Sequence, residues 1–66
     1  MDAKSIGNKL IELRSTSSRE EVAEKIGVSI SALAMYEQGN RIPRDEIKIK
    51  IAQYYGKSVQ EIFFES

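Results

Sequence analysis

The sequence contains no cysteine and no histidine among its 66 residues. These absences exclude a disulfide framework and the usual zinc sites, whose ligands are cysteine and histidine. They also leave no evident pair of nucleophile and general base, so we expect neither an enzyme nor a bound cofactor or metal. A chain without cysteine suits the reducing cytoplasm, which is where we expect this protein.

Long apolar segments are missing as well. No run approaches the ~20 residues that a helix needs to span a bilayer. The first residues, MDAKSIGNKL, lack the apolar region of a secretory signal. We therefore expect no contact with a membrane.

Net charge is zero, because ten lysines and arginines balance ten aspartates and glutamates. A strong nucleic-acid binder is more often basic, so this balance counts mildly against such a role. Nucleic acid stays open as a partner, since the placement of cations on one face matters more than their total. The length predicts a single domain over residues 1–66 with a small core, because chains of ~60 residues bury only about 60% of their surface.

Apolar spacing and capping residues predict three helices in the first half of the chain. Apolar residues recur at helical spacing over about 4–14. Ser18 opens a capping box, S-x-x-E, and Gly27 is placed to end the helix that follows. Ser29 is placed to cap a third helix that runs to about Gln38.

The second half predicts two more helices. The stretch EIKIKIA alternates as a strand would, but we favour a helix, because Asp45 and Glu46 suit a first helical turn and no second strand is available. Gly56 closes this helix, and a second capping box from Ser58 to Glu61 opens a short last one. The expected fold is all-α, a compact bundle of five short helices.

Residues of about 19–38 form the most informative segment. Ala23 suits a close crossing of two helices, Gly27 suits the turn, and Leu33 supplies apolar contact between them. This arrangement resembles the helix-turn-helix unit, whose second helix enters a major groove. The segments IGNKLIELR, SREEVAEKIGVS, MYEQGNRIP and IAQYYGKSVQEIF extend the likeness along the chain. In that order they resemble the Cro and phage-repressor (XRE-like) family of five-helix DNA-binding domains.

The resemblance implies a role for several residues. It pairs Arg14 with Glu37 in a structural ion pair. Its groove-facing positions, which would read bases through thymine methyl contacts and a serine hydroxyl, are Ile30, Ser31, Ala34 and Met35. Its phosphate-contacting positions are Arg19, Asn40 and Arg41, with Arg44 and Lys9 as weaker candidates. The alternative is that the arginines are solvated charges and that Ile30 and Met35 are buried.

The chain departs from the family pattern at two positions. Arg19 stands where the family usually has a glutamine that touches the DNA backbone. Lys48 stands where a core leucine is common.

The last helix suggests a homodimer. Ile62, Phe63 and Phe64 are consecutive, and consecutive residues do not all face one core. Ile49 lies far round its helix from the apolar face. Members of the resembled family commonly dimerise through the last helix, so these four residues are the expected interface. The alternative is that one phenylalanine caps the monomer's core and the other is merely exposed.

The leading functional hypothesis is a transcriptional regulator, a repressor that binds a near-palindromic operator in double-stranded DNA as a homodimer. The competing hypothesis is an antitoxin or antirepressor whose main partner is a protein. The apolar reading helix and the zero net charge suit that second role.

Overall fold

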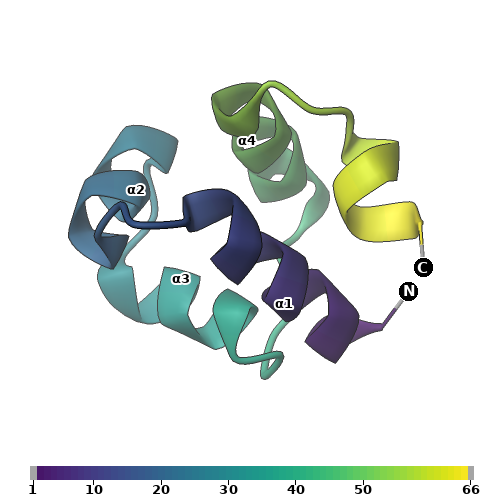
Figure 1. The fold of residues 1–66 in the computed structure, drawn as a ribbon, viewed down its shortest axis with the longest axis horizontal. Helices are drawn as coiled ribbons and strands as arrows, with labels where there is room; N and C mark the ends of the chain where they lie inside the picture. The colour runs from purple at the N-terminus through teal and green to yellow at the C-terminus, as the bar shows by residue number, and fades with distance from the viewer. Residues whose placement is uncertain (1, 66) are drawn as a thin grey trace.

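The computed structural model describes residues 2–65 as an all-helical fold (Figure 1). Its elements are α1 (Ala3–Arg14), α2 (Arg19–Ile26), α3 (Ile30–Glu37), α4 (Asp45–Tyr55) and the π-helical turn η1 (Gln60–Phe64). The predicted all-α fold of five short helices is confirmed, and EIKIKIA is helical, as favoured. Over this described part of the chain, no helix is both long and apolar enough to cross a membrane.

Serine side chains start the helices where the sequence predicts. The hydroxyls of Ser18 and Ser29 each accept the backbone amide three positions on, at 3.1 and 3.0 Å. Ser58 and Glu61 make both bonds of a capping box, at 3.1 Å from the Glu61 amide and 2.9 Å to its carboxylate. These bonds satisfy amides that the first helical turn leaves without partners.

One apolar core lies where the helices meet. Helix α1 packs on α3 and η1, and α2 packs on α3 and α4 (Figure 1). The buried apolar side chains of this core are Ile6, Leu10, Val22, Ala23, Ile26, Leu33, Tyr36, Ile51, Ala52, Ile62 and Phe63. Every element contributes side chains to this core. Helix α3 packs against α1 and α2 on one side, and its opposite side is exposed to solvent.

The crossing of α1 over α3 depends on Gly7. A β-carbon at this position would lie 2.9 Å from the backbone oxygen of Tyr36 and would also clash with the backbone oxygen of Glu37. The two helix backbones therefore approach more closely than a side chain would allow. This contact sets the position of α3 and was not identified in the sequence, where only Ala23 was given such a role.

The last turn corrects the predicted dimer interface. Ile62 and Phe63 are 2% and 1% exposed and belong to the core of the monomer, whereas Phe64 is 52% exposed. Adjacent residues are separated by a smaller angle in a π-helical turn than in an α-helix, so two neighbours can face the same core. Assigning Ile62 and Phe63 to the interface was therefore wrong.

Candidate nucleic-acid interface

Helices α2 and α3 are joined by a short turn. Gly27 has a left-handed backbone with φ of 91°, and its amide and that of Val28 both donate to the carbonyl of Ala23, at 2.8 and 3.0 Å. Ser29 then caps α3. Because this turn is closed by its own hydrogen bonds, α3 leaves α2 in a fixed direction, as a helix-turn-helix unit requires.

The outer face of α3 carries the residues expected to read bases. Ile30 is 48% exposed, and Ser31 is exposed beside it. Ala34 and Met35 are half-buried and reach the same surface one turn on. The structure thus places all four at the surface, and the alternative that Ile30 is buried is wrong.

Cations follow the C-terminal end of α3. Arg41 and Arg44 are exposed, and neither has an ion-pair partner among residues 2–65. Asn40 is also exposed, and its side-chain amide donates to Gln38 at 3.2 Å. This end of α3 therefore offers two unpaired guanidinium groups and an amide to an anion.

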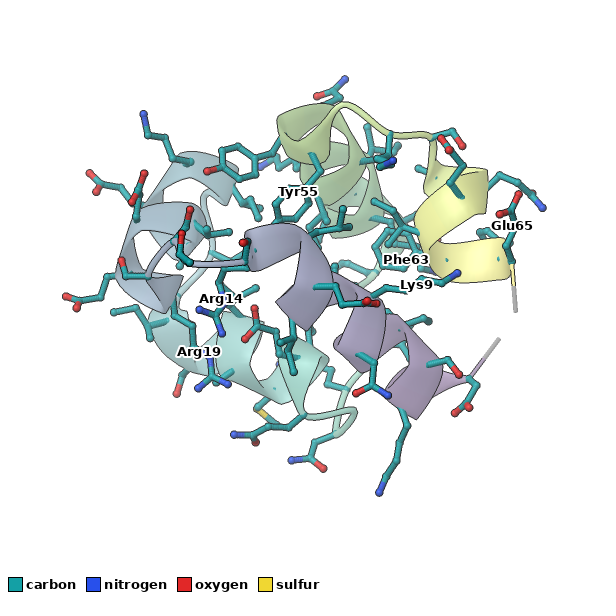
Figure 2. All side chains as sticks on the ribbon, viewed as in Figure 1. Lys9, Arg14, Arg19, Tyr55, Phe63 and Glu65 are labelled. Atoms are coloured by element: carbon teal, nitrogen blue, oxygen red, sulfur yellow. The ribbon has the colours of Figure 1, made fainter. Side chains whose placement is uncertain are left out.

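Glu37 ends α3 and is the centre of a buried ion cluster. Its fully buried carboxylate accepts from Arg14 Nε at 2.7 Å and Nη2 at 3.1 Å. Its Oε1 also accepts from Arg19 Nε at 2.8 Å. The hydrogen bond with Glu37 raises the pKa of Arg14. Figure 2 shows Arg14 and Arg19 together at the junction of α2 and α3.

Arg19 therefore has a partner that the sequence did not reveal. The sequence predicted only a phosphate contact for Arg19, at the start of α2. In the structure its guanidinium also binds the Glu37 carboxylate, beside Arg14. Sequence spacing gives no signal for this contact, because Arg19 and Glu37 are 18 positions apart and meet only when α2 and α3 have crossed.

Lys9 lies away from this surface. Its ammonium donates to the backbone carbonyls of Glu61 at 3.1 Å and Glu65 at 2.7 Å, at the end of η1 (Figure 2). Two backbone carbonyls thus accept hydrogen bonds from the Lys9 ammonium in the free protein, and its phosphate contact stays a prediction.

Comparison with known proteins gives two relatives. The transcriptional repressor RstR of the cryptic phage CTXphi, from Vibrio cholerae, is 37% identical over 49 residues, which are 74% of this chain and 44% of that protein. An uncharacterized HTH-type transcriptional regulator of Methanocaldococcus jannaschii is 33% identical over 46 residues, 70% of each chain. This chain thus spans less than half of the first relative. No solved structure matches.

The family itself is shown by a match over most of the chain. The model of the Helix-turn-helix family matches residues 10–62, a range that contains α2, α3 and the turn between them. The resemblance to XRE-like proteins is confirmed by this match and by the two relatives. The chain belongs to the helix-turn-helix family.

Proposed function

We propose that the chain is a DNA-binding transcriptional regulator, and that it acts as a repressor. The observation that carries this proposal is the absence of acid from the outer face of α3. Glu37 is the one carboxylate of that helix, and it is buried against two arginines. The acidic residues that bring the net charge of the chain to zero therefore add no negative charge to the outer face of α3. The relatives, named as a repressor and a regulator, support the same role.

In this proposal α3 enters the major groove. Ser31 bonds to a base edge, and Ile30 and Met35 contact thymine methyl groups. Arg41, Arg44 and Asn40 bind phosphates beyond one end of α3, which fixes the register of the helix without reading sequence. Apolar contacts discriminate weakly, so spacing of half-sites and DNA shape supply the remaining specificity.

A homodimer would supply that spacing. Ile49 is 50% exposed and Phe64 is 52% exposed, and they border an apolar groove together with Val59. Lys48 is buried beside it, with its ammonium 5.5 Å from the Phe64 ring and 3.3 Å from Asp45. A second copy would cover this groove, and two half-sites one turn of DNA apart would require the two reading helices to lie about 34 Å apart.

Selection of bound sequences from random DNA tests the proposal directly. A repressor dimer should recover a near-palindromic site, and its affinity should fall steeply with salt. Arg41→Ala should weaken binding to all sequences alike and reduce the slope of log K against log salt by roughly 0.9. Failure to enrich any DNA, with no salt dependence, would reject the proposal.

The exposed apolar side chains favour a second candidate function. Ile30 and Ile42 are 48% and 39% exposed, and side chains of this kind also bind proteins. An antitoxin or antirepressor would use this surface against a protein partner. Such a protein would bind DNA weakly at every salt concentration, and Ile30→Ser would abolish binding of the protein partner.

A further inference from the structure

Glu37 has more partners than one structural ion pair requires. Three guanidinium nitrogens donate to its buried carboxylate, two from Arg14 and one from Arg19. Two positive charges against one negative charge leave an excess of one positive charge in the cluster. The position of that excess charge depends on which guanidinium nitrogens of each arginine already donate to the protein.

The two arginines differ in the nitrogens that remain free. Arg14 uses all three, since its Nη1 also donates to the carbonyl of Ser17 at 2.8 Å. Arg19 donates only through Nε, and no group within residues 2–65 accepts from its two terminal nitrogens. The Arg19 side chain is also the more exposed, at 36% against 18% for Arg14. The excess charge therefore lies at the outer edge of Arg19.

We infer that Glu37 is a positioning residue for DNA binding, holding Arg19 so that its terminal nitrogens face a phosphate. This inference rests on the proposed function. A guanidinium is planar and rigid, so fixing its Nε edge on the carboxylate also fixes the direction of its other edge. The arginine is ordered before DNA arrives, which lowers the entropy lost on binding.

Replacing Arg19 with lysine tests the positioning of the side chain separately from its charge. Its single nitrogen is a point charge and cannot present one edge to a carboxylate and another to a phosphate. Arg19→Lys therefore keeps the net charge of the protein but removes the arrangement. Arg19→Ala removes both, and it avoids glutamine, which touches the DNA backbone at this position in the resembled family.

The experiment measures affinity by fluorescence anisotropy for a random-sequence duplex of about three helical turns, in a series from about 50 to 200 mM salt. Arg19→Lys should weaken binding about tenfold, the effect of one charge-assisted hydrogen bond, with the salt slope unchanged. Arg19→Ala should weaken it further and reduce the slope by roughly 0.9. Lys25→Ala, which removes an exposed cation from the other end of α2, is the matched control for charge.

Glu37→Gln completes a double-mutant cycle. If the carboxylate positions Arg19, the effect of Arg19→Lys on affinity should largely vanish in the Glu37→Gln background. Thermal unfolding establishes the temperature at which each variant is folded. If Glu37→Gln does not fold, the single variants at Arg19 decide the matter.

The outcomes are distinct. Wild-type affinity in Arg19→Lys, with a reduced slope in Arg19→Ala, would make Arg19 an ordinary phosphate contact and overturn the role of Glu37. Wild-type affinity in both variants would remove Arg19 from the interface. If the wild-type protein shows no salt-dependent binding, it is the proposed function that fails.

Discussion

The Glu37 carboxylate binds arginines from two other helices. Glu37 is fully buried and joins α1, α2 and α3 through Arg14 and Arg19. Buried charge is tolerated only when it is paired, so the three side chains depend on one another. The pairing of Arg14 with Glu37 could be expected from family resemblance, but the second arginine could not.

Glu37→Gln should destabilise the protein strongly. Removing one member of a buried ion cluster costs about 3–5 kcal/mol, and the partial exposure of both arginines places the expected loss at the lower end. Urea unfolding measures it, with Glu24→Gln on the exposed face of α2 as the control. Equal stability of the two variants would show that the cluster contributes little to the fold.

The hydroxyl of Tyr55 is the one buried side-chain polar atom without a hydrogen-bond partner in the described part of the chain. Burial, with a smaller effect of the nearby Glu37 carboxylate, raises its pKa to about 12. The folded protein therefore holds this proton more tightly than the unfolded chain, in which a tyrosine has a pKa of about 10. The free energy of unfolding should fall as pH rises from about 10 to 12.

Tyr55→Phe should be as stable as the wild type at neutral pH, or more stable, because it removes a desolvated hydroxyl that bonds to nothing. It should also lose part of the alkaline decline in stability. Unfolding at about pH 8 and pH 11 tests both expectations. Tyr54→Phe, a change at the exposed neighbour whose charge has a smaller effect on the pKa of Tyr55 than burial has, should retain most of the decline.

At the scale of helices, the start or the end of most elements could be predicted from single residues. Ser18, Ser29 and Ser58 cap helices, and Gly27 and Gly56 end them with left-handed backbones. These signals act within one turn, so the sequence displays them. The contacts of Lys9, Arg19 and Gly7 join residues at least 18 positions apart, well beyond one helical turn, and local patterns carry no information about them.

Gly7→Ala should destabilise the protein, although alanine is the better helix former by about 1 kcal/mol. The added methyl group would meet the backbone oxygens of Tyr36 and Glu37, which cannot move without shifting α3. Overpacking of this kind costs about 1–3 kcal/mol. Asn8→Ala, at the exposed next position of α1, should instead be neutral or stabilising in the same thermal unfolding assay.

Residues 2–65 expose one apolar region on α3, at Ile30, and another around Ile49 and Phe64. The proposed function assigns the first to DNA and the second to another copy of the chain. Each phenylalanine that a dimer buries would contribute about 1.5–3 kcal/mol, less the part that is already buried in the monomer.

Phe64→Ser should therefore weaken the dimer at least about tenfold, since the change occurs in both copies. Sedimentation equilibrium at micromolar concentration measures the association. Ile11→Ser, at another exposed apolar position, is the control and should associate as the wild type does. A wild-type mass equal to that of the monomer would contradict the dimer.

The bond between Lys9 and the carbonyl of Glu61 joins positions 52 apart, and this separation has a consequence for synthesis on the ribosome. Helix α1 emerges first, but its partners Ile62 and Phe63 emerge only after all the other helices. Helix α3 emerges sooner, but at about 5–20 residues per second the part of α1 that packs on η1 stays uncovered for seconds. A ribosome-bound chain halted before Gln60 should therefore be cut readily by protease, and one extended well beyond Glu65 should resist.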